Sequence, residues 1–471
     1  MENIIAQQLV KMQGEILKKI QENGLENIGQ TAEDIFQTLK EWACALLGVI
    51  LEATDAEIAR ATKERKQDGL KVKERNVIRQ LVTSLGVLQY RRTYYETSEG
   101  ERIYLLDHLI GVAPHERVSK ALCAKLVNLA AEMSYGKSAK HGAAEISRQT
   151  VCNKINSLRQ VAADVTRMQE TPKELHIFAD EDHVHMKDGR SAMVPLVTIA
   201  EGIDTSNPKR HRLINPLHIA GYGMDAEAFN DQVEACVNER YDINAIEHIY
   251  IHGDGAQRIV RLGEHFPNAV HVLDGFHLEK YLKKLGHYNG AAQRMGALRA
   301  ALRDGNWKSY KKLLRDIYTL QSEKEKECCL QIIRYLWNHR QAAHLRYASD
   351  ICGSCTESLV SHVLSERLSR TPLAWSERGL QKMAMLVVYH KNGQKITARD
   401  IRVSMTAAEE AQEEMSLRGG WRKYNDYMNR QVDLILDTDW ANAFQKQALT
   451  FGKVDAAYLI RKAFGAVHTI A

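Results

Sequence analysis

The chain has 471 residues, which is too long for one compact core and predicts several domains. Hydrophobic residues make up 44% of the sequence, a fraction that excludes a disordered chain. The net charge of +5 does not mark the whole chain as a nucleic-acid-binding protein, so any basic surface must be local.

The sequence also lacks the usual signs of export. Its N-terminus has neither the basic start nor the apolar core of a signal peptide, and its most apolar stretch, residues 42–51, is about half as long as a membrane span. The eight cysteines are scattered, and the C-x-x-C pair of Cys352 and Cys355 lacks the second pair of a structural zinc site. We expect a soluble cytoplasmic protein with reduced cysteines.

The first 117 residues predict a helical arm followed by a β-hairpin. Residues 1–60 carry apolar side chains at helical spacing. Residues 61–117 open with a basic, mixed-charge segment and continue with VTSLGVLQYRRTYY, whose β-branched and aromatic residues favour a strand pair. Arg91 and Arg92 in this hairpin allow two interpretations, contact with DNA phosphates or a basic edge strand that stays soluble.

Residues 118–165 predict three short helices that resemble a helix-turn-helix DNA-binding region. In the third helix, Val151, Ile155 and Leu158 recur at helical spacing and would pack inward. Ser147 would cap its N-terminus. The outward positions carry side-chain types that read bases and phosphates, namely Arg148, Gln149, Asn153 and Lys154. An ordinary helical hairpin explains the pattern about equally well.

From residue 172 the pattern changes to alternating strands and helices. Apolar runs predict five strands, at residues 175–180, 193–203, 212–222, 247–255 and 269–277. Helices are predicted before and after the fourth strand. This order is that of a ribonuclease-H-like mixed α/β core, so the predicted fold class is a multidomain α+β protein.

The predicted ribonuclease-H-like core has two parts. The first part covers residues 172–277 and the last part covers residues 351–395. Between them, residues 278–350 are charged and helical without strand signals, which predicts a helical insertion. Residues 396–471 predict a C-terminal helical region without obvious chemistry.

Three carboxylates point to a metal site. Asp180 and Asp254 lie at or just beyond the C-terminal ends of predicted strands, where catalytic groups gather in open α/β sheets, and Glu357 opens a helix that can pack across them. Convergent carboxylates repel one another unless a hard divalent ion such as Mg²⁺ joins them. Any one of these acids alone is better explained as a turn former or helix cap, and it is their joint position in one ordered pattern that favours a metal site. Asp182 remains an alternative to Asp180.

Around these acids the sequence resembles the ISLre-type insertion-sequence transposases, a family related to the Mutator-like DDE transposases. The resemblance is carried by the blocks FADEDHV at 178–184, HGDGA at 252–256 and LDGFH at 273–277. The last block matches the D-x-x-H signature of Mutator-like enzymes. A further block, GSCTE at 353–357, resembles the family's third-carboxylate motif. Together with the Arg91–Arg92 hairpin and the turn at Ser147, the resemblance spans roughly the whole chain.

The resemblance implies a DDE mechanism without a covalent enzyme–DNA intermediate. Water would attack the phosphodiester at the element end, and the freed 3′-hydroxyl would then attack target DNA. Asp180, Asp254 and Glu357 would hold Mg²⁺, with Mn²⁺ as a substitute. Asp274 and His277 would be accessory residues, although a purely structural role for His277 at the strand end fits as well.

The partners implied are DNA, as terminal inverted repeats and as target, and further copies of the chain in a homo-oligomeric complex at the bacterial nucleoid in the cytoplasm. Basic residues of the helical insertion would touch DNA, or form a solvated helical face: Lys283, Lys284, Arg294, Arg299 and Arg303. Two other functions stay open. One is a ribonuclease-H-like nuclease without strand transfer, and the other is a DNA-binding protein derived from a transposase.

Overall fold

The computed structural model describes residues 2–23, 27–67, 69–142, 146–158, 165–207, 211–347, 353–370 and 373–401. These residues form two compact units. Of the described residues, the first unit takes in those up to 130, 135–158 and 396–401, and the second takes in 131–134 and those from 165 to 395. Within the described ranges, no helix combines the length and the apolar character that crossing a membrane requires. The predicted C-terminal helical region lies outside the described residues from position 402 on.

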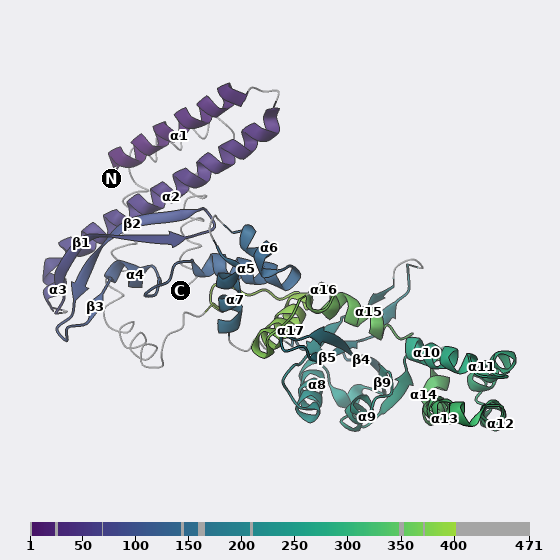
Figure 1. Ribbon diagram of the computed structural model, residues 1–471. Helices are drawn as coiled ribbons and strands as arrows, with labels where there is room; N and C mark the ends of the chain where they lie inside the picture. The colour runs from purple at the N-terminus through teal and green to yellow at the C-terminus, as the bar shows by residue number, and fades with distance from the viewer. Residues whose placement is uncertain are drawn as a thin grey trace. The chain divides into compact units, whose positions relative to one another are not determined.

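The first unit combines long helices with a small sheet (Figure 1). Its elements up to the sheet are α1 (Glu2–Asn23), α2 (Ile28–Arg60), α3 (Thr62–Gln67), β1 (Lys71–Val82), β2 (Val87–Glu96) and β3 (Arg102–Ile103). Helices α1 and α2 occupy the segment predicted as a helical arm and lie side by side. The antiparallel strands follow the order β1-β2-β3. Helix α2 packs so closely on β2 that a Cβ at Gly48 would lie 2.8 Å from the Gln89 carbonyl oxygen.

Short helices complete the first unit. They are α4 (Leu105–Leu109), α5 (Lys120–Glu132), α6 (Tyr135–Lys140) and α7 (Arg148–Ser157). The Ser147 hydroxyl caps α7 by accepting a hydrogen bond from the Thr150 backbone N–H at 3.1 Å. The inward side of α7 carries Val151 and Ile155, which are buried as their spacing predicts.

The second unit is built around a five-stranded mixed sheet. Its strands are β4 (Glu174–His185), β5 (Ser191–Ala200), β8 (Leu217–Ala220), β9 (His248–Gly253) and β10 (Ala269–Leu273). Their order is β10-β9-β4-β5-β8. Strand β5 runs antiparallel to both of its neighbours, β4 and β8, whereas β9 and β10 run parallel to β4. A two-stranded ribbon, β6 (Ile203–Asp204) and β7 (Arg212–Leu213), lies between β5 and β8 in the chain. The predicted mixed α+β fold is therefore confirmed.

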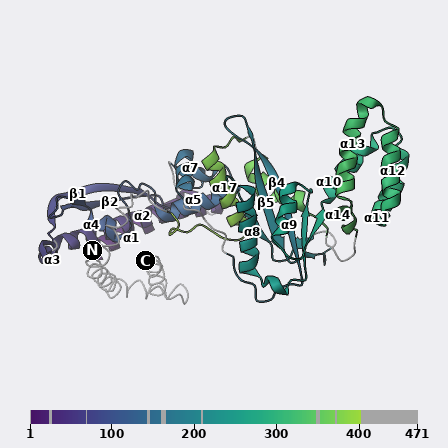
Figure 2. The same ribbon diagram turned by 90° about the horizontal axis from the view of Figure 1, so that it is seen from below.

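Helices cover both faces of this sheet (Figures 1 and 2). Helices α8 (Ala226–Arg240) and α9 (Gln257–Glu264) pack on one face, where Ile177, Ile199 and Ile251 belong to a buried apolar core with Phe229 and Val233. A 3-10 turn, η2 (Ile243–Ala245), follows α8. The other face meets α15 (Thr356–Val360), the π turn η4 (Ser361–Ser365), α16 (Glu366–Leu368) and α17 (Glu377–Lys391).

Between β10 and α15 the chain forms a helical insertion with its own apolar core. Its elements are α10 (Gly275–Gly286), η3 (Ala292–Arg294), α11 (Met295–Arg303), α12 (Trp307–Thr319), α13 (Glu323–Asn338) and α14 (Arg340–Leu345). Figure 2 shows these helices as a group beside the sheet. Leu282, Leu298 and Tyr310 are fully buried among them. The insertion begins at Gly275, three residues before the predicted start at 278, because Asp274 already caps α10.

Candidate active site

Strand β4 carries the first predicted ligand on the face opposite the α8–α9 core. Side chains alternate along a strand, so His176, Phe178, Asp180 and Asp182 share one face while Ile177 points into the core. The strand does not end at Asp180, as the sequence suggested, but continues to His185 because its antiparallel pairing with β5 goes on. Its pairing with β9 stops at Phe178 and His252.

The second and third acids come close to Asp180. Asp254 directly follows the end of β9, which runs parallel to β4, and Glu357 lies in the first turn of α15, which packs against β4. Burial raises the pKa of Asp180 to about 6, and the negative charges of Asp254, Glu357 and Asp274 add to that rise. The positive charge of His277 opposes it. The fold thus brings all three predicted carboxylates, and both predicted accessory residues, into one cluster.

Asp274 acts as a hydrogen-bond acceptor at the centre of this cluster. Its carboxylate accepts from the Ser354 hydroxyl at 2.6 Å and from the His277 backbone N–H at 3.2 Å, and it lies 3.2 Å from His277 Nδ1. Although burial opposes ionisation, these hydrogen bonds hold the pKa of Asp274 below its ordinary value. Asp274 therefore stays charged and ties the start of α10 to the segment that precedes Glu357.

His277 lies beside the acids, and its surroundings favour its protonated form. Its hydrogen bond with Asp274 raises its pKa, burial opposes the rise, and the charges of Asp180 and Asp254 add to it. The two histidines beneath the acids differ from it: His176 Nδ1 and His252 Nε2 lie 3.1 Å apart, and burial lowers their pKa values to about 4 and about 3. Those two rings are neutral near pH 7 and do not offset the carboxylates.

Asp182 is engaged elsewhere, which bears on the choice between it and Asp180. Its Oδ1 accepts hydrogen bonds from the Ser365 hydroxyl at 3.1 Å and from the Ser369 hydroxyl at 2.9 Å, and the residue is 6% exposed. Asp182 thereby holds the η4–α16 segment against β4. The geometry favours Asp180 as the ligand.

The loop that carries Asp254 is held by the helical insertion. The Tyr335 hydroxyl on α13 donates to the Asp254 carbonyl oxygen at 2.6 Å, and the Asp254 side chain accepts from the Ala256 backbone N–H at 2.8 Å. Gly255 has φ of +83°, and a Cβ there would lie 2.5 Å from the His339 ring. Sequence reasoning missed Tyr335 and His339, since nothing in their local pattern links them to a residue some 80 positions earlier.

Arg258 in the first turn of α9 was also missed. Its guanidinium forms an ion pair with Glu181, the residue beside Asp180. Burial lowers the pKa of Arg258, and the charge of Asp180 opposes that shift. A second positive charge therefore lies near the acid cluster.

Carboxylate oxygens are the ligands that a hard divalent ion prefers, and the charges of Asp254 and Glu357 act on Asp180. Among the described residues, however, the group whose ligand atoms all lie within 4.8 Å of one another is a different one, Glu227, Asp231 and His265. Glu227 and Asp231 are exposed on α8, and His265 Nδ1 is 2.9 Å from Glu234. Ordinary surface ion pairing explains that group without a metal.

The predicted DNA-binding residues of α7 lie on its outer side. Arg148, Gln149 and Asn153 are exposed, and Lys154 is half-buried. The Gln149 amide donates to the Asn153 side chain at 2.8 Å. Their contact with DNA stays a prediction.

The two hairpin arginines have different environments. The Arg91 side chain is 55% exposed and lies 3.6 Å from Glu52. Arg92 is buried, forms an ion pair with Asp107 and stacks 3.5 Å over the Tyr104 ring. This burial contradicts the predicted phosphate contact for Arg92. The prediction assumed that the side chain points outward from an edge strand, but α4 packs on this strand and covers it.

Some of the basic residues proposed in the helical insertion are already paired within it. Arg299 forms an ion pair with Glu279, and Arg294 donates to the Gly290 carbonyl oxygen at 2.6 Å. Arg303 lies 3.7 Å from Asp304. For these three, an intramolecular role explains the charge at least as well as DNA contact.

Comparison with known proteins gives a consistent family. A family model described as an uncharacterised protein family, UPF0236, matches residues 20–404. A UPF0236 protein of Caldanaerobacter subterraneus subsp. tengcongensis is 36% identical over 401 residues, which are 83% of this chain and 84% of the relative. A second from that organism is 36% identical over 378 residues, 78% of this chain and 80% of the relative. A UPF0236 protein in the vanSb 3′ region of Streptococcus gallolyticus is 25% identical over 338 residues, 67% and 73% of the two chains. The chain belongs to the UPF0236 family.

Proposed function

We propose that this protein is a DDE transposase that cleaves DNA at the ends of an insertion sequence and joins the freed ends to target DNA. The observation that carries the proposal is the cluster of Asp180, Asp254 and Glu357. There burial, together with the charges of the other two acids, raises the pKa of Asp180. Carboxylates that repel one another in this way are stabilised by a divalent cation.

The proposal includes a ribonuclease-H-like fold for the core of the second unit. Three antiparallel strands, β4, β5 and β8, come first in the chain, and two strands parallel to β4 follow, in the spatial order β10-β9-β4-β5-β8. The helical insertion then precedes α15, which carries Glu357. This succession supports the resemblance to ISLre-type insertion-sequence transposases.

In this function the cluster works as a phosphodiester-cleaving site. Asp180, Asp254 and Glu357 would hold Mg²⁺, or Mn²⁺ in its place. When bound, such ions activate the attacking water and stabilise the leaving oxygen. Glu357 is exposed, which leaves the cluster open to a DNA strand. His277, which is hydrogen-bonded to Asp274 and whose pKa that contact raises, would bind a phosphate oxygen of that strand when protonated.

The relatives add support of another kind. The Caldanaerobacter relative that is 36% identical over 401 residues is named after eleven gene loci. A further relative of 34% identity carries four. A protein named at many loci of one genome is what repeated transposition of its gene would leave. A stationary nuclease or a DNA-binding protein does not require such multiplication.

The partners of the proposal are terminal inverted repeats and target DNA, met in the bacterial cytoplasm at the nucleoid. Recognition of the repeats would fall to α7 through Arg148, Gln149, Asn153 and Lys154. Two copies of the chain would cooperate in a homo-oligomer, since an element has two ends to cut.

The test uses the full-length protein and DNA from the borders of its gene, where inverted repeats flanked by short direct repeats are expected. With Mg²⁺ the wild type should nick this DNA at the element end and join that end to a plasmid. Asp254→Asn should abolish both steps while DNA binding stays nearly intact, because a ligand to the ion is lost.

The matched control is Asp231→Asn, which removes one carboxylate from the exposed group on α8. It should cleave like the wild type. If Asp231→Asn lost cleavage while Asp254→Asn cleaved normally, the metal site would lie at the exposed group that contains Asp231. That result would overturn the assignment of Asp254 as a metal ligand. Cleavage without joining would identify a nuclease instead of a transposase.

A further inference from the structure

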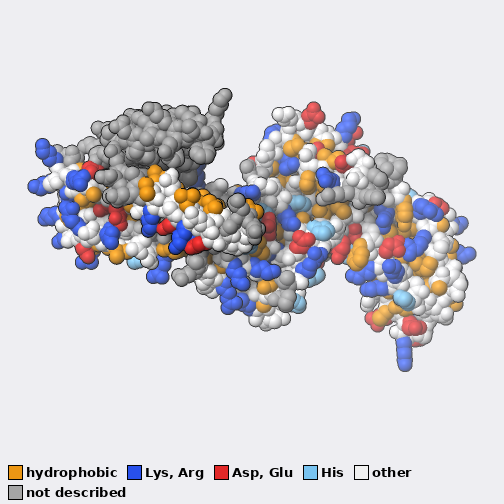
Figure 3. Space-filling model, turned by 90° about the horizontal axis from the view of Figure 1, so that it is seen from above, with side chains coloured by type: hydrophobic (Ala, Val, Ile, Leu, Met, Phe, Trp, Pro, Cys, Tyr) orange, Lys and Arg blue, Asp and Glu red, His pale blue; other side chains and the backbone are white. Residues whose placement is uncertain are grey.

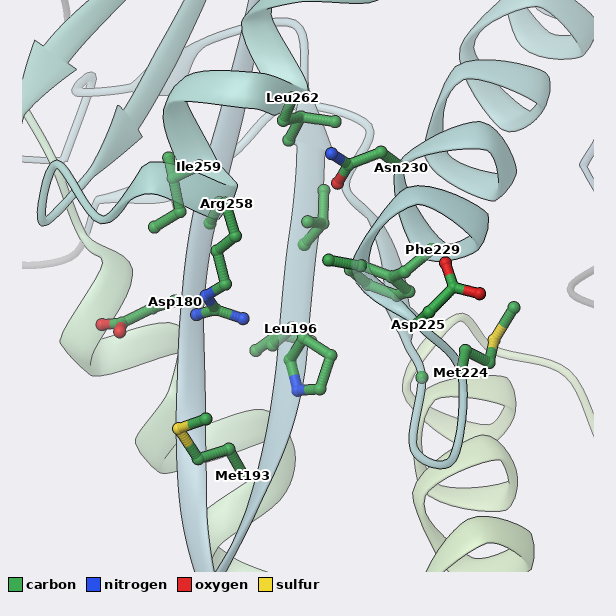
Figure 4. A pocket seen from close by; sticks show the side chains of 15 residues that line it. Asp180, Met193, Leu196, Met224, Asp225, Phe229, Asn230, Arg258, Ile259 and Leu262 are labelled. Atoms are coloured by element: carbon green, nitrogen blue, oxygen red, sulfur yellow. The ribbon is translucent and has the colours of Figure 1, made fainter.

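A cavity of about 200 Å³ lies on the α8–α9 side of the sheet, between strands β4 and β5 and the N-terminal ends of α8 and α9, with Asp180 in its lining (Figure 4). Its walls are mostly apolar and include Met193, Leu196, Phe229 and Leu262. The volume is below the range of roughly 300–1,000 Å³ that drug-sized ligands occupy. The cavity therefore suits a single small ring system.

One buried polar group lines this apolar cavity without a partner. Asn230 on α8 is 5% exposed, and its side-chain nitrogen has no hydrogen-bond partner among the described residues. Figure 4 shows the Asn230 amide directed toward the cavity from the side of Phe229. A buried amide without a partner is unfavourable, so a ligand that offers a hydrogen-bond acceptor at its edge would stabilise this side chain.

The cavity and the acids share one edge of β4. Strand β9 pairs with β4 only as far as Phe178, so among the described residues no strand pairs with β4 on that side at Asp180. Asp180 and Arg258 both line the cavity, and in Figure 4 the Asp180 carboxylate points away from it while Arg258 lies between. A DNA strand with a phosphate bound at the acids could therefore pass a neighbouring base around this open edge of β4 to the cavity.

We propose that the cavity receives one nucleobase, unstacked from the DNA strand that the acid cluster cleaves. The inference rests on the proposed function. Phe229 and Met193 would contact the face of the base. The Asn230 amide would form hydrogen bonds with the edge of the base, since an amide offers both a donor and an acceptor. Arg258 would neutralise the adjacent phosphate. The base would mark the position of the scissile bond in the strand.

The experiment uses element-end DNA in which 2-aminopurine replaces one nucleotide at a time around the scissile phosphate. The full-length protein is added in EDTA, so that the DNA is bound but not cut. We expect the fluorescence of 2-aminopurine to change sharply at one position next to the scissile phosphate, because a base in the cavity has left the stack.

Two variants close the cavity in different ways. Asn230→Leu removes the amide at similar volume, and Met193→Trp fills the mouth from a residue that is 56% exposed, so folding should tolerate it. Both should lose the fluorescence change, and Asn230→Leu should cleave intact DNA about tenfold more slowly, as the loss of one buried polar contact predicts. On DNA that is abasic at the same position, Asn230→Leu and the wild type should cleave at equal rates. Asn238→Leu, the same change at an exposed position of α8, should behave as the wild type.

The outcomes separate the two proposals. If the wild type cleaves element ends but no position unstacks, or if Asn230→Leu is equally slow on abasic DNA, the nucleobase site is overturned and the transposase stands. If the wild type with Mg²⁺ neither cleaves nor joins element ends, the proposed function fails and the nucleobase site fails with it.

Discussion

Asp180 and Asp182 share one face of β4 yet have different partners. Asp182 accepts hydrogen bonds from Ser365 and Ser369 and so stabilises the packing of the η4–α16 segment. Asp180 accepts a hydrogen bond from the Glu181 backbone N–H at 2.9 Å and otherwise faces the charges of the acid cluster. The first arrangement uses one carboxylate oxygen, Oδ1, to hold a neighbouring segment, whereas the second leaves the Asp180 side chain among other acids, where a cation would stabilise it.

At this scale, substitution of Asp182 should affect stability more than chemistry. Asp182→Ala leaves the Ser365 and Ser369 hydroxyls without their acceptor and should lower the free energy of unfolding by about 1–3 kcal/mol. Asp182→Asn keeps an acceptor oxygen and should retain cleavage within a few-fold. Urea unfolding and a cleavage assay measure the two effects. A folded Asp182→Asn protein without cleavage would instead make Asp182 a ligand.

The raised pKa of Asp180 predicts a pH effect in the absence of metal. Its folded-state pKa of about 6 lies above the ordinary value of 3.8, so the folded state holds the proton more tightly than the unfolded state does. Stability from this group is present below about pH 4 and is lost as the pH rises to about 6. Relative to Asp180→Asn, the wild type in EDTA should lose about 2–3 kcal/mol between these pH values.

Comparing the wild type with Asp180→Asn cancels the contributions of titrating groups whose pKa does not depend on Asp180, such as the buried His176 and His252. Addition of Mg²⁺ at pH 7 should raise the melting temperature of the wild type more than that of the variant, because the ion relieves the repulsion at Asp180. Equal pH profiles of stability for the two proteins would refute the burial argument.

Helix α13 is the element of the helical insertion that contacts the loop carrying Asp254. The Tyr335 hydroxyl reaches the Asp254 carbonyl oxygen, and the Tyr335 ring stacks on Tyr281 of α10 with centroids 3.7 Å apart. His339 at the end of α13 closes over Gly255. The insertion thus helps to position the loop that presents Asp254.

Tyr335→Phe should therefore slow cleavage without affecting DNA binding. The variant keeps the stacked ring but loses one buried hydrogen bond, worth about 1 kcal/mol, and the Asp254 loop should become less well ordered. We expect a several-fold fall in kcat and a weaker apparent affinity for Mg²⁺. Tyr318→Phe, on α12 of the same insertion, serves as the control. Unchanged kcat and Mg²⁺ dependence in Tyr335→Phe would mean that the loop holds its shape alone.

On the scale of the whole molecule, basic residues do not form one large patch on the face that Figure 3 shows. Figure 3 shows basic and acidic side chains interspersed over the visible face, in keeping with the net charge of +5. Binding of DNA then depends on local groups. The exposed side of α7 belongs to the first unit and the acid cluster to the second, so recognition and cleavage should respond to separate substitutions.

Arg148→Ala tests this separation. It should weaken binding to the terminal repeats and reduce the slope of log affinity against log salt concentration by about one, because one phosphate contact is lost. Nicking at saturating protein should stay near the wild-type rate. Lys18→Ala on α1, whose side chain is 73% exposed, provides a basic control in the same unit. An unchanged affinity and salt slope would exclude Arg148 from the interface.

The sequence by itself determined the elements and the faces they present. Periodicity of apolar residues encodes strands and helices locally, which is why the mixed α+β fold, the cap at Ser147 and the buried face of α7 follow from it. The same local reading placed Asp254 after a strand. Glu357 depended on the resemblance to a family, because no local pattern distinguishes it from other helix-opening acids.

Only the tertiary structure decided which side chains meet. Partners from distant parts of the chain include the serines that donate to Asp182, the aspartate that pairs with Arg92 and the tyrosine that donates to the Asp254 loop. Such partners leave no periodic trace, since hydrogen bonds and ion pairs form between positions set by the packing of whole elements. The cavity around Asn230 likewise exists only once β4, β5, α8 and α9 are assembled.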